Sequence, residues 1–158
     1  MSIFVKTTIA PKPRTKEAKQ VSLFYAGVLV VFVVTQLFTF DTFIELIPAF
    51  NLPLGPMMNF AVAPLLVASE LFAIPFLLRM QLSVAFRWLS MMLGLLVSVM
   101  WVGITAWIAV TQPAVSTVGF LGTLFDLVPG WWAVFIALAL VIIATWSSWG
   151  LWPGKRNK

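Results

Sequence analysis

The sequence contains neither cysteine nor histidine, and few of its residues are charged. Without cysteine the chain can form no disulfide and can hold no iron–sulfur cluster through thiolates. Without histidine it lacks the usual ligand of haem, zinc and copper, and the usual proton carrier at neutral pH. We therefore expect no metal site and no cofactor bound through Cys or His, and we identify no catalytic residues.

Charge is scarce as well. Only 9% of the 158 residues are charged, whereas 61% are hydrophobic and the mean hydropathy is +1.03. A soluble domain carries about a quarter charged residues. Four segments, 21–40, 57–78, 88–110 and 131–152, reach the ~20 apolar residues that a membrane-spanning helix needs. We predict an all-α integral membrane protein, a four-helix transmembrane bundle over 21–152, between a basic arm (1–20) and a basic tail (153–158).

The basic residues are placed asymmetrically. All ten Lys and Arg lie in the arm, in the tail or in the turn between the second and third spans, whereas the connections 41–56 and 111–130 contain only acidic charges. The positive-inside rule then predicts that both termini are cytoplasmic. Basic flanks attract anionic lipid heads. We expect membrane lipids as partners, no nucleic acid, and a multi-pass location in a prokaryotic inner or plasma membrane.

The connection 41–56 combines apolar residues with prolines. Thr42 and Glu45 have the spacing of a capping box, which predicts a short helical turn at the outer interface. Such a turn could act as a lid over an outward-facing cavity or as a plug that seals the bundle, and we favour the plug.

The spans carry features that predict how the helices pack. Ser90, Gly94 and Ser98 recur every four residues, so they lie along one face of the third span and favour close helix contact. Pro64 and Pro75 interrupt the second span, where each removes a backbone donor and is expected to bend the helix. The carbonyl groups freed there need other partners.

Glu70 is the one ionisable residue well inside a predicted span. A charge at the centre of a membrane helix costs about 2.5–3.5 kcal/mol, so Glu70 is expected to face the bundle interior. Ser98 and Thr145 come to a similar depth and are candidate members of a buried polar site. Glu70 could be a proton-binding or quinone-binding carboxyl, a cation ligand, or a structural hydrogen-bonding group, and we favour the structural role.

Four further polar residues are candidates for contacts at the helix ends. Gln36 and Asn59 lie near the outer ends of their spans and are expected to cap or bridge helices there. Arg79 and Arg87 flank the cytoplasmic turn and are expected to contact lipids or a partner subunit.

The order of several short motifs resembles that of the DoxX/MauE-like family of four-helix membrane proteins, over roughly residues 21–110 and more loosely to residue 150. The motifs are Phe24-Tyr25-Ala26-Gly27, Gln36-Leu37-Phe38, Ala68-Ser69-Glu70-Leu71 and Arg87 at the start of the third span.

This resemblance implies a four-helix bundle associated with membrane redox systems. Glu70 matches the acidic residue of the family's second helix, and Arg87 matches its basic residue at the start of the third. Two departures stand out: Gln36 replaces a lysine that many members have, and Thr117-Val118-Gly119-Phe120-Leu121-Gly122 lacks the two cysteines of MauE-type members. Thiol redox chemistry is therefore excluded.

These observations lead to a predicted function and two alternatives. We predict a non-catalytic accessory or scaffolding subunit of a larger, redox-linked membrane complex, with other membrane subunits as partners. The first alternative is a quinone-reactive oxidoreductase subunit with Glu70 as a buried proton carrier. A small-solute transporter is the weaker alternative, because no internal repeat is evident. The 14 Phe and 8 Trp would suit contacts with lipid, quinone or pigment, although they suit packing inside the bundle better.

Overall fold

The computed structural model of the chain describes residue 10 and residues 12–152, and its elements in this part are five helices. They are α1 (Lys16–Phe38), α2 (Phe40–Ala49), α3 (Pro56–Leu77), α4 (Val84–Thr111) and α5 (Trp131–Gly150). All but α2 are long and apolar enough to cross a membrane. The predicted all-α transmembrane bundle is confirmed. The predicted tail 153–158, and residues 1–9 and 11 of the predicted arm, lie outside the described residues.

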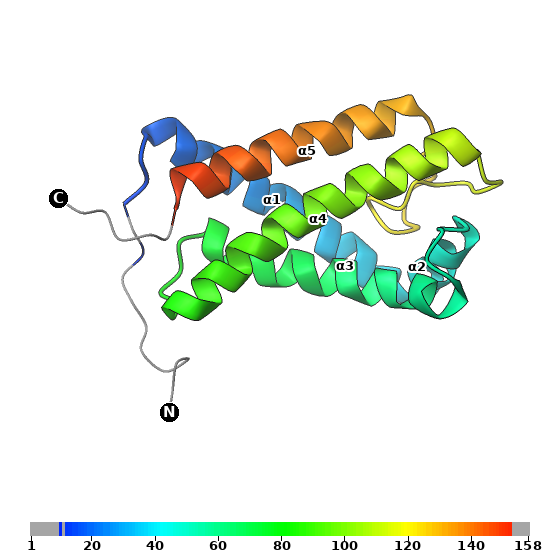
Figure 1. Cartoon of the computed structure of the whole chain (residues 1–158), viewed down its shortest axis with the longest axis horizontal. Coiled ribbons are helices and arrows are strands. Elements are labelled where there is room, and N and C mark those ends of the chain that lie inside the picture. Colours follow the sequence, from blue (N-terminus) through cyan, green and yellow to red (C-terminus); the bar gives the residue numbers. More distant parts are fainter. Residues whose placement is uncertain (1–9, 11, 153–158) are drawn as a thin grey trace.

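The four long helices form a closed ring in which each one packs against two others. α1 contacts α3 and α5, and α4 contacts the same two helices (Figure 1). Consecutive long helices run in opposite directions, as in an up-and-down bundle. The backbone N–H of Arg14, just before α1, donates to the carbonyl oxygen of Gly150 at the end of α5 (3.0 Å). The start of α1 and the end of α5 therefore lie at one end of the bundle, and the cytoplasmic location of that end stays a prediction.

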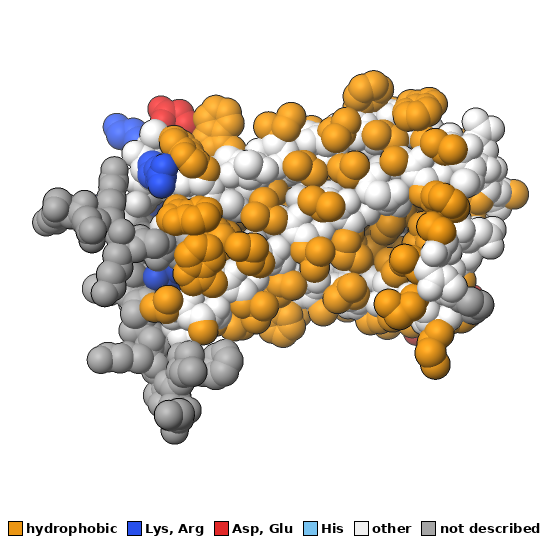
Figure 2. All heavy atoms as spheres, viewed as in Figure 1, with side chains coloured by type: hydrophobic (Ala, Val, Ile, Leu, Met, Phe, Trp, Pro, Cys, Tyr) orange, Lys and Arg blue, Asp and Glu red, His pale blue; other side chains and the backbone are white. Residues whose placement is uncertain are grey.

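The outer surface of the bundle is apolar along most of its length. Figure 2 shows hydrophobic side chains spread over one face, with Lys and Arg side chains gathered at one end. Large side chains point outward, among them Phe38 and Val110, which are 83% and 71% exposed. Such a surface suits hydrocarbon as the surrounding solvent.

Two long helices begin earlier than the sequence predicts, because polar side chains cap their N-termini. The hydroxyl of Thr15 accepts from the N–H of Ala18 (3.0 Å), so α1 begins at Lys16 and not at residue 21. The hydroxyl of Ser83 accepts from the N–H of Phe86 (3.2 Å), so α4 begins at Val84 and not at residue 88. Serine and threonine are favoured at this position since they satisfy a free N–H of the first turn.

The predicted helical turn in 41–56 is a ten-residue helix, α2, which packs against α3 at the end of the bundle away from Lys16 (Figure 1). Phe43 and Ile47 on its inner face are fully buried, as a plug requires. The predicted capping box is wrong: the helix begins at Phe40, ahead of Thr42, whose hydroxyl donates to the carbonyl oxygen of Thr39 (3.0 Å).

α3 continues through both of its prolines, and α4 supplies a hydrogen-bonding partner beside Pro75. The hydroxyl of Ser90 accepts from the N–H of Phe76 (3.2 Å) and donates to the carbonyl oxygen of Phe72 (2.5 Å), with that of Ala73 also in reach (3.3 Å). The carbonyl group freed by Pro75 is that of Leu71, four residues earlier, whereas Ser90 bonds to backbone groups of Phe72, Ala73 and Phe76. The expectation that the freed carbonyl groups take other partners therefore stays a prediction. The predicted small-residue face of α4 thus lies against α3.

Candidate functional site

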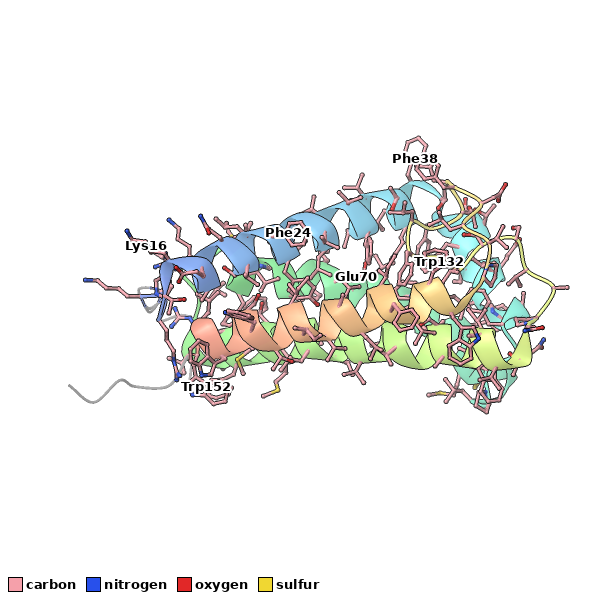
Figure 3. All side chains as sticks on the ribbon, turned by 90° about the horizontal axis from the view of Figure 1, so that it is seen from above. Lys16, Phe24, Phe38, Glu70, Trp132 and Trp152 are labelled. Atoms are coloured by element: carbon pink, nitrogen blue, oxygen red, sulfur yellow. The ribbon has the colours of Figure 1, made fainter. Side chains whose placement is uncertain are left out.

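Glu70 lies in the middle of the bundle, where α3 turns its carboxyl group toward α1 and α4 (Figure 3). The residue is fully buried. Its Oε1 accepts a hydrogen bond from the indole N–H of Trp101 on α4 (2.9 Å) and a longer one from the Nε2 of Gln36 on α1 (3.4 Å). The carboxyl group therefore links three of the four spanning helices.

A fourth part of the chain reaches this site from the end of the bundle opposite Lys16. The segment 112–130, which joins α4 to α5, brings the carbonyl oxygen of Phe120 to 3.1 Å from the Nε2 of Gln36. The ring of Phe120 lies 4.7 Å from that of Trp101 and stacks on that of Phe32 at 5.6 Å, measured between centroids. The carboxyl group and its donors are thus covered by an aromatic cluster of Phe32, Trp101 and Phe120.

Glycines allow the segment 112–130 to approach so closely. Gly119 and Gly122 have φ angles of +90° and +60°, which are unfavourable for residues with a side chain. A Cβ atom at Gly122 would come within 3.1 Å of the Cα of Gln36 and of the carbonyl oxygen of Thr35. The absence of a side chain at Gly122 is therefore what lets the segment lie against α1 beside Gln36.

The hydrogen bonding of the site is incomplete. Among the described residues, the Oε2 of Glu70, the Oε1 of Gln36 and the Oγ of Ser69 are buried and have no hydrogen-bond partner. An unpaired carboxylate oxygen in a low-dielectric interior is costly, and a proton or one small polar ligand on it would lower that cost. In the part of the chain described, no group of three or more acidic, His or Cys residues is placed to hold a metal ion.

Neither of the other residues predicted to share the buried site forms a hydrogen bond with Glu70, since each hydroxyl bonds within its own helix. Ser98 is fully buried, but its hydroxyl donates within α4 to the carbonyl oxygen of Leu95 (2.8 Å). Thr145 is exposed on α5, and its hydroxyl donates to the carbonyl oxygen of Val141 (2.7 Å). The predicted burial of Thr145 is wrong, because equal depth along two helices does not place two side chains on facing sides.

The four residues predicted to form contacts at the helix ends lie in different environments. Gln36 contacts the central site, as described above. Asn59 is buried, and its Nδ2 donates to the carbonyl oxygen of Leu52 (3.4 Å), which ties the start of α3 to the connection before it. Arg79 lies just after α3 and has a φ of +58°. Arg87 lies in the first turn of α4 and is 6% exposed, and its Nη2 donates to the carbonyl oxygen of Leu82 (3.4 Å). Burial leaves Arg87 little surface for a lipid or a partner.

Sequence reasoning missed Trp101, the shortest contact of the Glu70 carboxyl. The signal was present, since Trp101 lies three residues beyond Ser98 and so continues the face marked by Gly94 and Ser98. Tyr25 was also missed: it is the only tyrosine, it is buried, and its hydroxyl donates to the carbonyl oxygen of Gly94 (2.7 Å). The approach of Phe120 had no signal in the sequence beyond its neighbouring glycines.

Comparison of the chain with protein-family models, with curated proteins and with solved structures finds no match. The resemblance to the DoxX/MauE-like family therefore stays a prediction from the sequence.

Proposed function

We propose that this chain is a non-catalytic accessory or scaffolding subunit of a larger membrane complex. The observation that carries the proposal is the use of the central carboxyl group inside the bundle. Glu70 accepts from side chains of α1 and α4, and Gln36 carries the contact on to the segment 112–130. Polar groups used in this way join helices to one another. The apolar outer surface is then free for lipid and for other subunits.

An apolar hollow beside the connection before α3 supports the same proposal. It has a volume of about 270 Å³ and lies between α3, α4 and the connection before α3. Its lining includes Val62, Met100 and Trp107, but neither Glu70, Gln36 nor Trp101. A small molecule in this hollow would not touch the carboxyl group. The placement of the complex in a redox system rests on the family resemblance alone.

The second candidate is a quinone-reactive subunit with Glu70 as a buried proton carrier. One observation favours it: the Oε2 of Glu70 is buried and has no partner among the described residues. A protonated carboxyl group could donate from this oxygen to a carbonyl oxygen of a quinone. A redox step would then take two electrons from a partner subunit and two protons to give the quinol, with Glu70 relaying one of the protons.

The substitution Glu70→Gln separates the two candidates. Glutamine keeps an acceptor oxygen for Trp101 and Gln36, but it cannot carry a proton. An accessory subunit would still co-elute with the same membrane proteins in mild detergent after Glu70→Gln, and turnover of the complex would be unchanged. A chain that purifies alone with stoichiometric quinone, and loses it on Glu70→Gln, would overturn the accessory role. Solute flux through liposomes containing this chain alone would point instead to the transporter alternative.

A further inference from the structure

The outer side of α5 carries a second hollow, whose lining does not include Glu70 or its partners. It is an open groove of about 530 Å³ lined by Val141, Ile142, Thr145, Trp146 and Trp149. The only hydroxyl in this lining belongs to Thr145 and donates to the carbonyl oxygen of Val141 within the helix. The groove therefore offers an apolar surface, with two indole rings toward the end of α5.

A fixed cation stands beside the groove. The guanidinium carbon of Arg14 lies 4.8 Å from the centroid of the Trp149 ring, which is a cation–π contact. The backbone of Arg14 is held as well, through the bond of its N–H to the carbonyl oxygen of Gly150. The side chain of Arg14 is exposed, so a ligand in the groove can reach it from outside the bundle.

The charge around Arg14 has one predominant sign. Between residues 12 and 19 there are four basic side chains and one acidic one, and all five are exposed. Figure 3 shows Lys16 at the same end of the bundle as Trp152, opposite the end marked by Phe38. This end therefore presents a cationic surface directly beside an apolar groove that runs along the membrane-spanning part of α5.

We propose that the groove on α5 binds an anionic phospholipid, with an acyl chain along 141–149 and the headgroup phosphate at Arg14. Hydrocarbon is what surrounds four apolar spans, and indole rings favour the level where acyl chains meet headgroups. A guanidinium group can bind a phosphate through two parallel hydrogen bonds. The cationic surface selects an anionic headgroup over a zwitterionic one. This site is independent of the proposed accessory role.

The test compares two lipids on the full chain in mild detergent. Native mass spectrometry would count bound phosphatidylglycerol and phosphatidylcholine with identical acyl chains, each added at the same concentration. We expect at least a fivefold preference for phosphatidylglycerol, lowered to near parity by Arg14→Gln. Trp149→Leu should reduce the retention of both lipids. Equal retention of the two lipids by the native chain would overturn the proposal.

Two matched substitutions control for general effects. Lys19→Gln removes one positive charge at the same end without touching the Arg14–Trp149 pair. Trp152→Leu removes an indole ring that packs on Trp88 (5.1 Å between centroids) outside the groove lining. Both controls should keep the lipid preference. If Lys19→Gln lowers it as far as Arg14→Gln does, diffuse charge explains the binding and the site is disproved.

A photoactivatable phosphatidylglycerol with a diazirine on its acyl chain locates the site without relying on affinity. In vesicles of phosphatidylcholine with a small fraction of this probe, labelling should concentrate on the peptide that contains 141–149. In the Arg14→Gln variant, labelling of this peptide should fall. Labelling spread evenly over all spans would contradict the proposal. So would a photoreactive group at residue 142 that crosslinks only to a second copy or to another protein.

Discussion

α3 forms polar contacts with α4 in two places, and the two differ in how fully they are paired. Beside Pro75, the hydroxyl of Ser90 both accepts and donates, and every partner lies on the neighbouring helix. At Glu70, two donors share one carboxylate oxygen while the other has no partner among the described residues. The serine contact is local and complete, whereas the carboxyl contact depends on α1, α4 and the segment 112–130 together.

This difference shows two ways of burying polarity in a membrane protein. A neutral hydroxyl such as that of Ser90 can form all its hydrogen bonds with the backbone of one neighbouring helix beside a proline. A carboxyl group needs donors from several elements, so its environment is only as stable as the least stable of them. The Glu70 site should therefore be more sensitive to change than the Ser90 site.

The largest effect is expected for Trp101→Ala. The substitution removes the 2.9 Å donor to Glu70 and a ring that contacts those of Phe32 and Phe120, so it leaves a cavity and a poorly paired carboxyl group. We expect a loss of about 3–5 kcal/mol in the free energy of unfolding. Denaturation in mixed detergent micelles, followed by circular dichroism, would measure it. Trp101→Phe is the intermediate control, since it keeps an aromatic ring at this position but loses the N–H and part of the indole volume. A loss below about 1 kcal/mol for Trp101→Ala would contradict the description of the site as jointly supported.

Gly122→Ala should have the next largest effect, because it displaces the segment 112–130 and leaves the helices unchanged. The φ of +60° is unfavourable for alanine, and the added Cβ would press on the backbone of α1 at Gln36. A destabilisation of about 1–3 kcal/mol is expected. Limited proteolysis should cut within 112–130 sooner in this variant. Gly103→Ala is the matched control, because a Cβ there meets nothing within 4 Å. Equal proteolysis of the two variants would disprove the close approach.

Ser90→Ala should lower the free energy of unfolding by less, about 0.6–1.7 kcal/mol, which spans the average and the maximum for hydrogen bonds between membrane helices. The effect should shrink in a Pro75→Ala background, since alanine at 75 restores the missing N–H and straightens the local backbone. A double-mutant cycle on the free energy of unfolding measures this coupling. Additive effects of the two substitutions would show that the hydroxyl and the proline act separately.

The smallest effect is expected for Thr145→Val. Its hydroxyl bonds only within α5 and its side chain is exposed, so the free energy of unfolding should change by less than about 0.5 kcal/mol. A loss comparable to that of Trp101→Ala would mean that Thr145 belongs to the central site after all.

The candidate site could be predicted only in part, and the residues show why. Glu70 is conspicuous in the sequence because an ionisable side chain is costly inside a membrane. Its partners are not conspicuous: Trp101 resembles any other tryptophan of an apolar helix, and Gln36 was expected to contact groups at the helix end. Depth along a helix follows from residue number, but the direction in which a side chain points within the bundle depends on how each helix is rotated. That is why Ser98 and Thr145, at matching depths, do not pair with Glu70.

The sequence by itself determined the four spans and the absence of thiol and histidine chemistry. Long apolar runs and missing residue types are properties of composition, and they do not depend on how the helices meet. Only the tertiary structure decided that the segment 112–130 returns to contact Gln36, that Ser90 supports the helix at Pro75, and that Arg14 stacks on Trp149. These contacts join residues far apart in the chain, and their geometry follows from the packing of the whole bundle.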